Sequence, residues 1–260
     1  MKIGFFDSGL GGLTIFKEAI NQFRSDYIYL GDIMNAPYGI KQKEEVKKFI
    51  FNHMEYLVNK NCGIIVIACN TATSVCIKEL REKYPKTCFI GTEPAVKPAL
   101  LLNNHKKVLV MATSLTLKEE KLQNLIDRLD AKNNAVLLPM DKLVRFAEDY
   151  EKINYVDAEK YIKDKFSKIN FDEFSSIVLG CTHFPLFRKE FEMNIPKNIE
   201  VIDSAKGVVN NMVNHAREMG IEESDQSSIN LTLTKSDSFF LEKASKILNV
   251  EKENLGYIII

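Results

Sequence analysis

The sequence has no excess of charge of either sign. Its 260 residues include 35 Lys and Arg and 35 Asp and Glu, so the formal net charge is zero. Proteins that bind nucleic acids usually carry a basic excess, so this balance argues against a nucleic-acid partner. It also means that an anionic substrate must be bound by local hydrogen-bond donors rather than by the field of the whole protein.

Long hydrophobic runs are lacking as well. The run CGIIVIAC at residues 62–69 is far shorter than the roughly 20 residues that a helix needs to cross a bilayer. Asp7 interrupts the apolar N-terminal segment almost at once, which is not the pattern of a signal peptide. We therefore expect a cytoplasmic protein with no membrane partner.

Cysteine is scarce, and no CxxC pair occurs. The cysteines stand at positions 62, 69, 76, 88 and 181. An odd number of cysteines without secretion signals predicts reduced thiols. Since CxxC pairs are the usual mark of a structural zinc site, we expect no metal site.

What is present is the composition of a folded protein with regular alternation. Hydrophobic residues make up 45% and charged residues 27%, which excludes a disordered chain. Strands are predicted at residues 2–6, 27–30, 64–68, 107–111, 176–179 and 229–234, and helices at 14–23, 43–60, 74–84, 115–129, 143–150, 156–169, 206–219 and 239–248. This alternation predicts the α/β class, with mainly parallel sheets covered by helices.

A weak internal repeat divides the chain. Ile65–Thr71 reads IVIACNT and Ile177–His183 reads IVLGCTH, and each is a buried strand followed by a small residue, a cysteine and a hydrogen-bonding pair. An earlier strand in each half also ends in polar residues, at Asp7-Ser8 and at Thr113-Ser114. The repeat predicts two similar, pseudo-symmetric α/β domains.

The domains are expected to comprise residues 1–96 plus 208–260 and residues 97–207, with the C-terminal segment returning to the first domain. The strand ends that carry the cysteines would then face each other. Ligands of α/β proteins usually bind at such strand ends, so we expect the active site in the cleft between the domains.

The repeated cysteines carry the functional hypothesis. Cys69 and Cys181 each follow a buried strand, where the N-terminus of the next helix is expected to lower the pKa of the thiol. His183 is close enough in sequence to share a proton with Cys181. Two thiols that face each other can remove a proton from one face of a carbon and deliver one to the other face, which inverts a stereocentre without a cofactor.

The remaining cysteines and histidines are expected to be structural. Cys62, Cys76 and Cys88 match small buried hydrophobic residues. His53, His105 and His215 have no partner visible in the sequence, so we expect them to be structural or solvated.

Four segments resemble those of glutamate racemases, in the cofactor-independent aspartate/glutamate racemase superfamily. They are FFDSGLGG (5–12), APYG (36–39), ACNTAT (68–73) and GCTHFP (180–185). The resemblance runs from the first residues to about residue 204 and is weaker beyond. It implies interconversion of L- and D-glutamate, no cofactor, glutamate as a small-molecule partner and a role in peptidoglycan synthesis; the sequence leaves room for a homodimer.

The resemblance also implies roles for individual residues. Cys69 and Cys181 would be the proton-transferring thiols, with Asp7 and His183 as their respective assisting groups and Glu148 as an acidic group near the second thiol. The substrate's amino and carboxylate groups would be held by Ser8, Asn70, Thr71, Thr182 and the Tyr38-Gly39 backbone, and its distal carboxylate by Thr113 and Thr116.

Several alternatives remain open. An aspartate racemase or another cofactor-independent amino-acid racemase would share these residues. An NAD(P)-dependent oxidoreductase would use the Gly9–Gly12 turn and Asp32, but G-x-G-x-x-G needs a third glycine where Thr14 stands. A Cys-His hydrolase ranks lower, because residues two apart at a strand end rarely point at one another. A non-catalytic amino-acid-binding protein would need the donors but neither thiol.

Overall fold

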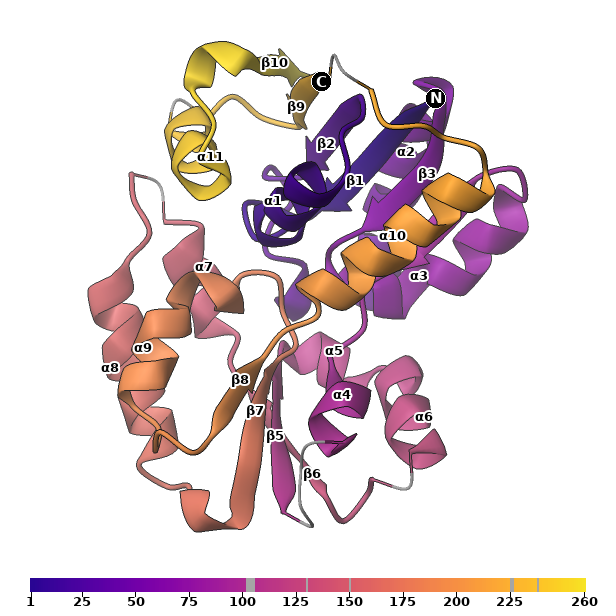
Figure 1. Ribbon diagram of the computed structural model, residues 1–260. Helices are drawn as coiled ribbons and strands as arrows, with labels where there is room; N and C mark the ends of the chain where they lie inside the picture. The colour runs from indigo at the N-terminus through magenta and orange to yellow at the C-terminus, as the bar shows by residue number, and fades with distance from the viewer. Residues whose placement is uncertain (102–105, 130, 150, 225–226, 238) are drawn as a thin grey trace.

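The computed structural model describes residues 1–101, 106–129, 131–149, 151–224, 227–237 and 239–260. Within these residues the strands form two sheets, one of six strands in the order β10-β9-β2-β1-β3-β4 and one of four in the order β6-β5-β7-β8. The strand pairings in both sheets are parallel. The predicted class, two α/β units with parallel sheets, is confirmed (Figure 1).

The larger sheet brings the two ends of the chain together. Its strands are β1 (Lys2–Asp7), β2 (Tyr27–Gly31), β3 (Cys62–Ile67), β4 (Cys88–Gly91), β9 (Ile229–Leu233) and β10 (Leu255–Ile259). Because β9 pairs with β2, the C-terminal segment lies beside the N-terminal strands (Figure 1). One face packs against α1 (Leu13–Gln22), α10 (Ala205–Glu218) and α11 (Phe240–Leu248), and the other against α2 (Lys43–Asn59) and α3 (Asn70–Lys83).

The smaller sheet is built from the middle of the chain. Its strands are β5 (Lys107–Ala112), β6 (Ala135–Pro139), β7 (Phe174–Leu179) and β8 (Glu200–Ile202). One face packs against α4 (Val96–Leu101) and α6 (Glu120–Arg128), next to the short α5 (Ser114–Lys118), and the other against α7 (Lys142–Ala147), α8 (Tyr155–Phe166) and α9 (Arg188–Met193). Short 3-10 turns are η1 (Tyr38–Ile40), η2 (Phe171–Glu173), η3 (Phe184–Phe187) and η4 (Lys252–Asn254). Helices on both faces explain why the central strands read as continuous apolar runs.

The central strand pair of each sheet repeats the same irregularity. The register of β1 against β3 shifts after Lys2, and the register of β5 against β7 shifts after Lys107, which is also the first residue of its strand. Both pairs then run in register to their carboxyl ends. The sequence repeat therefore corresponds to a structural repeat of β1–β3 in β5–β7.

Some elements differ from the prediction. The strands β4, β6, β8 and β10 and the helices α4 and α9 were not predicted from the sequence; all are short. The helix predicted from Ser74 begins at Asn70, because Cys69 is its N-cap. The helix predicted over residues 115–129 is interrupted at Glu119, whose backbone is extended.

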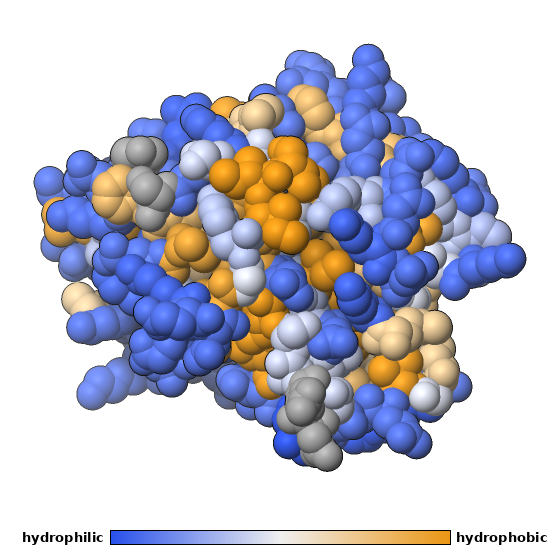
Figure 2. Space-filling view, turned by 90° about the horizontal axis from the view of Figure 1, so that it is seen from above, coloured by the Kyte–Doolittle hydropathy of each residue, from blue (hydrophilic) through white to orange (hydrophobic). Residues whose placement is uncertain are grey.

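One end of the molecule exposes hydrophobic residues among hydrophilic ones (Figure 2). Ile258, Ile259 and Ile260, in and after the edge strand β10, are each about half exposed. Figure 2 looks down on the end of the molecule that carries β9 and β10, where hydrophobic residues gather amid hydrophilic ones. In the part of the chain that the structure describes, no helix has the length and apolar character needed to span a bilayer.

Candidate active site

The carboxyl ends of the two sheets meet through hydrogen bonds. Thr182, after β7, donates from Oγ1 to Oδ2 of Asp7 at the end of β1, over 3.0 Å. Thr14, in α1, donates to the carbonyl of Thr182 over 3.1 Å. Leu10 N–H donates to Oε1 of Glu148, after α7, over 2.5 Å. The loops that carry the predicted site residues are therefore in direct contact.

Cys69 lies between the end of β3 and the start of α3. Its Sγ accepts a hydrogen bond from Ala72 N–H over 3.4 Å and lies 3.7 Å from Ser8 Oγ. Burial and the nearby charge of Asp7 raise the pKa of this thiol to about 12, although the Ala72 bond acts in the opposite direction. The expected lowering of its pKa is wrong, because removal from water outweighs one helix N–H group.

Asp7 is fully buried beside this thiol. Its carboxylate accepts hydrogen bonds from Gly9 N–H and Thr182 Oγ1, each over 3.0 Å. Burial raises the pKa of Asp7 to about 6, while the charge of His183 and the two hydrogen bonds act against the increase. A carboxyl group with this pKa changes protonation near neutral pH, as a proton-exchanging group should.

Cys181 is joined to a second set of groups. Its Sγ lies 3.6 Å from His183 Nδ1, and His183 Nε2 lies 2.6 Å from Oε1 of Glu148. Burial alone would lower the pKa of His183, but its hydrogen bonds with Cys181 and Glu148 raise the pKa well above 6.5. The protonated imidazole is then a proton donor held against the sulfur.

This geometry contradicts one argument made from the sequence. Side chains two residues apart after a strand were expected to point away from each other, yet Cys181 and His183 form a hydrogen bond. The reason is local, since His183 has helical backbone angles and caps η3, which folds the chain back on itself. The pairing of these two residues by itself therefore does not separate a racemase from a hydrolase.

The glycines after β1 admit groups from the other half of the chain. A Cβ atom at Gly9 would lie 2.0 Å from Oε1 of Glu148, and one at Gly11 would lie 2.6 Å from Nδ1 of His183. A side chain at either position would force Glu148 or His183 to move. The close approach of these two groups accounts for glycine in the turn without a dinucleotide.

Asp32, the acid that the oxidoreductase alternative requires, is already occupied. It is fully buried and accepts hydrogen bonds from Tyr38 over 2.5 Å and Thr234 over 2.8 Å, as well as from Asn35. His53 Nε2 lies 3.0 Å from the same carboxylate. A carboxylate enclosed in this way has no face left for a ribose, and His53 belongs to the same group of polar side chains around it.

Three threonine hydroxyls meet where the two halves touch. Thr71 Oγ1 lies 3.1 Å from the hydroxyls of both Thr113 and Thr116, which are 2.9 Å from each other. Gly39 packs against Thr113 so closely that a Cβ atom there would lie 2.6 Å from its Cβ. The three hydroxyls, each nearly fully buried, can turn from one another to a carboxylate.

The structure thus brings the predicted site residues together at one junction. Asn70 is buried there and donates to the carbonyl of Thr92 over 3.4 Å. The side chain of Tyr38 turns to Asp32, so only its backbone is left for a ligand. His215 lies on α10 beside Glu218, and His105 lies outside the described residues. Tyr29, which donates to the carbonyl of Gly9, was not predicted, because nothing in its strand sequence distinguishes it.

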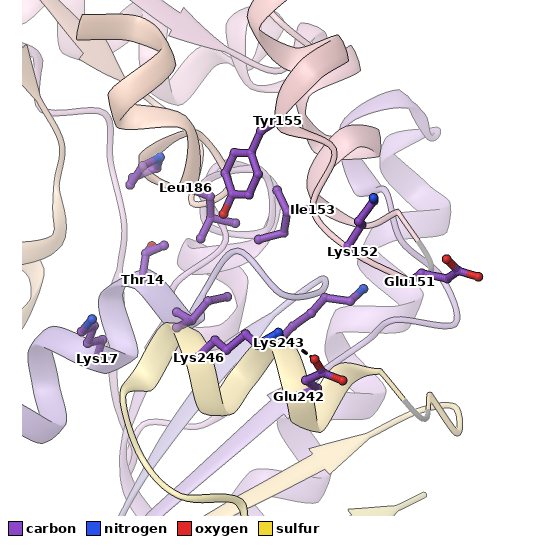
Figure 3. A pocket seen from close by; sticks show the side chains of 12 residues that line it. Thr14, Lys17, Glu151, Lys152, Ile153, Tyr155, Leu186, Glu242, Lys243 and Lys246 are labelled. Atoms are coloured by element: carbon purple, nitrogen blue, oxygen red, sulfur yellow. Dashed lines mark hydrogen bonds and ion pairs between the residues drawn. The ribbon is translucent and has the colours of Figure 1, made fainter.

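Two of the cavities that adjoin this junction are lined by Thr14 and by Glu148, respectively. The larger, of about 560 Å³, is lined by residues of α1, α11 and the segments 151–155 and 185–186. Figure 3 shows Tyr155 and Leu186 on one side of it and Lys243 and Lys246 on the other. The smaller, of about 320 Å³, has Glu148 in its wall together with Pro37 and Arg145. Among the described residues, no group of His, Cys, Asp and Glu side chains is arranged to hold a metal ion.

Comparison with known proteins gives one consistent result. The model of the Asp/Glu/Hydantoin racemase family matches residues 14–212. The glutamate racemase of Halothermothrix orenii is 42% identical over 254 residues, which are 97% of this chain and 100% of that protein. Glutamate racemase 2 of Bacillus subtilis is 45% identical over 210 residues, 80% of this chain and 78% of that protein.

Solved structures agree in fold. The glutamate racemase isoform RacE1 of Bacillus anthracis superposes with a TM-score of 0.85 at 25% identity, over 99% of this chain and 96% of that one. The glutamate racemase of Francisella tularensis in complex with D-glutamate superposes with a TM-score of 0.85 at 23% identity, over 100% and 97% of the two chains.

Proposed function

The chain belongs to the Asp/Glu/Hydantoin racemase family, and from this premise we propose that it interconverts L-glutamate and D-glutamate. The glutamate racemases that resemble it align over nearly the whole chain. The observation that carries the mechanism is that each thiol follows an equivalent strand and has an assisting group of its own. No other chemistry is needed to invert an α-carbon.

The reaction balances with two sulfur atoms. The thiolate of one cysteine takes the α-proton, so that the C–H bond breaks and an S–H bond forms. The thiol of the other cysteine gives its proton to the opposite face of the same carbon. The reverse reaction exchanges the two roles, and no electron or group is gained or lost.

The assisting groups prepare the thiols. Asp7, with its pKa near 6, is the proton-exchanging group for Cys69, and His183 with Glu148 serves Cys181. Burial and the charge of Asp7 raise the pKa of Cys69. The ammonium group of a bound amino acid brings a positive charge beside the sulfur, which favours its thiolate form.

The substrate's carboxylates are proposed to be held by neutral donors. We assign the distal carboxylate to the hydroxyls of Thr71, Thr113 and Thr116, which lie within hydrogen-bond distance of one another. Ser8, Asn70, Thr182 and the Tyr38-Gly39 backbone are assigned to the amino and α-carboxylate groups. Neutral donors fit a protein whose net charge is zero.

The experiment that tests the proposal follows the product of each enantiomer. Pure L-glutamate and pure D-glutamate, without added cofactor, should each converge on the racemate, and in heavy water the α-hydrogen should exchange for deuterium. L- and D-aspartate are the matched control for the length of the side chain. Faster turnover of aspartate would support the alternative substrate, a dependence on NAD(P) would support the oxidoreductase, and unchanged chirality would overturn the proposal.

Four further expectations from the sequence remain proposals. The domain division into residues 1–96 plus 208–260 and 97–207 is supported by the membership of the two sheets. A cytoplasmic location and a supply of D-glutamate to peptidoglycan synthesis follow from the proposed activity. The homodimer stays a prediction that light scattering at several protein concentrations will check.

A further inference from the structure

Tyr29 is a fully buried tyrosine whose hydroxyl faces the candidate site. It lies in the middle of β2 and donates to the carbonyl oxygen of Gly9 over 2.6 Å. Burial, together with the nearby charges of Asp7 and Glu148, raises the pKa of Tyr29 well above 10. The phenol therefore keeps its proton and acts on Gly9 as a hydrogen-bond donor.

The same peptide group also donates a hydrogen bond to Glu148, the carboxylate that contacts His183. The carbonyl of Gly9 and the N–H of Leu10 belong to one peptide unit, and that N–H donates to Oε1 of Glu148 over 2.5 Å. The same oxygen lies 2.6 Å from Nε2 of His183. A continuous series of hydrogen bonds thus runs from Tyr29 through one peptide to the histidine that contacts Cys181.

The peptide before it serves the other half of the site. Gly9 N–H donates to Oδ1 of Asp7 over 3.0 Å. The two carboxylates proposed to assist the two thiols are therefore held by consecutive N–H groups of one loop. Rotation of this loop would alter both sets of assisting groups together.

The loop needs an external anchor because its sequence gives it little stiffness. Glycine has the widest range of backbone angles, and a side chain at Gly9 would displace the carboxylate of Glu148. The hydroxyl of Tyr29 fixes the plane of the Gly9–Leu10 peptide. A bond to its carbonyl also polarises the peptide and strengthens the N–H as a donor to Glu148.

We propose that Tyr29 is a positioning residue for proton transfer, acting through the Gly9–Leu10 peptide to hold Glu148 against His183. This role rests on the proposed racemase function. Tyr29 itself does not touch the reacting atoms. Its effect must therefore be seen in the turnover of bound substrate rather than in the affinity for it.

The chain supplies a matched control in the same strand. Tyr27 is also nearly fully buried, and its hydroxyl donates to the carbonyl of Phe23 over 2.6 Å, next to the end of α1 rather than at the site. Tyr29→Phe and Tyr27→Phe each remove one hydroxyl that donates to a backbone carbonyl; the Tyr27 hydroxyl also lies 3.5 Å from the carbonyl of Ala19, and the Tyr29 hydroxyl also has a hydrogen bond with the backbone of Leu13. The phenyl ring in either variant keeps its packing against Phe16.

The expected result is a division between kcat and KM. Tyr29→Phe should lower kcat about fivefold, the worth of one hydrogen bond, and leave KM within about twofold. The primary isotope effect with α-deuterated glutamate should increase, because the proton-transfer step limits turnover more strongly. Tyr27→Phe should leave kcat, KM and the isotope effect unchanged, while its thermal stability should decrease by about as much as that of Tyr29→Phe.

A double-mutant cycle with Glu148→Gln tests the route. If Tyr29 acts through Glu148, then Tyr29→Phe should have much less effect on kcat in the Glu148→Gln background. If the effects of the two substitutions on kcat are additive, the inference about Tyr29 is overturned. The same holds if Tyr29→Phe has the same kcat as Tyr27→Phe. In both cases the proposed racemase function would stand. A wild-type protein that racemises no glutamate would overturn the proposed function and the inference with it.

Discussion

The two thiols occupy equivalent positions, but their assisting groups do not. The register of the central strands makes Ala112 the counterpart of Asp7, and Thr71 the counterpart of His183. One half of the site therefore has a carboxylate at a strand end, and the other has a histidine after the cysteine. The two halves are related by pseudo-symmetry, but their proton-exchanging groups are of different chemical types. We therefore expect the two directions of the reaction to differ in their dependence on pH.

At the residue scale, replacing either thiol should remove activity. Cys69→Ser and Cys181→Ser should each lower the rate of racemisation by about 10³-fold or more, because a hydroxyl is far less acidic than a thiol. Circular dichroism and thermal unfolding should show an intact fold. Cys88→Ser, at a half-buried cysteine on β4, is the control and should keep full activity. Near-normal turnover in either active-site variant would rule out the two-thiol mechanism.

Asp7 and Asp32 should respond to amide substitution in opposite senses. The folded-state pKa of Asp7 is raised to about 6, so its contribution to stability is present below pH 4 and is lost as the pH rises through 6. The pKa of Asp32 is lowered, since hydrogen bonds from His53, Tyr38 and Thr234 outweigh its burial. Its contribution is present above pH 4 and is lost as the pH falls.

At pH 8, Asp7→Asn should therefore raise the free energy of unfolding by roughly 2–3 kcal/mol, and Asp32→Asn should lower it. The Asp7→Asn difference should shrink towards pH 4, where the carboxyl of Asp7 is protonated, whereas the Asp32→Asn difference should shrink only as the pH falls below 4. Urea unfolding of the three proteins at several pH values measures this. A destabilising effect of Asp7→Asn at pH 8 would contradict the assigned desolvation of Asp7.

At the scale of single elements, the start of α3 combines a structural and a chemical task. Cys69 is both its N-cap and a proposed catalytic thiol. Sulfur is a weak hydrogen-bond acceptor, so the Ala72 N–H bond, at 3.4 Å, caps the helix poorly. The helix therefore begins with a residue chosen for its reactivity at the expense of stability.

Substitutions at this cap should separate the two tasks. Serine is a strong N-cap and alanine is a poor one, so Cys69→Ser should be more stable than Cys69→Ala by about 1 kcal/mol. Thermal unfolding of both inactive variants measures the difference. The pair Cys181→Ser and Cys181→Ala is the control, since the N-cap position of η3 is held by His183 and not by Cys181. An equal difference in the two pairs would show that the cap has no part in it.

At the scale of the whole molecule, the site lies inside the contact between two halves of the chain. The cysteines are only 5% and 8% exposed, and Asp7 is fully buried. Hydrogen bonds from Thr182 to Asp7 and from Leu10 to Glu148 cross the junction, as does the ion pair of Lys43 with Glu119, at 2.7 Å. We expect a substrate to reach the thiols when contacts of this kind open.

Opening should be visible as reactivity of single cysteines. With iodoacetamide at pH 8, followed by mass spectrometry, Cys69 and Cys181 should react slowly, and saturating glutamate should slow them several-fold further. Cys88, half-buried on β4, should react at a rate that glutamate does not change. Equal protection of all three would indicate a general stabilisation of the fold rather than a substrate held between the two thiols.

The unpredicted strands share a physical cause. The strands β4, β6, β8 and β10 lie at the edges of their sheets, so fewer of their residues are enclosed on both faces. Their apolar pattern is correspondingly weak, as in β6, where no residue is fully buried. The central strands were found from the sequence because burial on both faces demands a continuous apolar run.

By itself the sequence determined the α/β class, the repeated strand pair and the cysteines at its ends, because each is written in consecutive residues. Only the tertiary structure decided that Glu148 meets Leu10, 138 positions away, and that the hydroxyl of Tyr29 faces Gly9. Such contacts depend on how two separately folded sheets dock. No local pattern of apolar and polar residues encodes that relation.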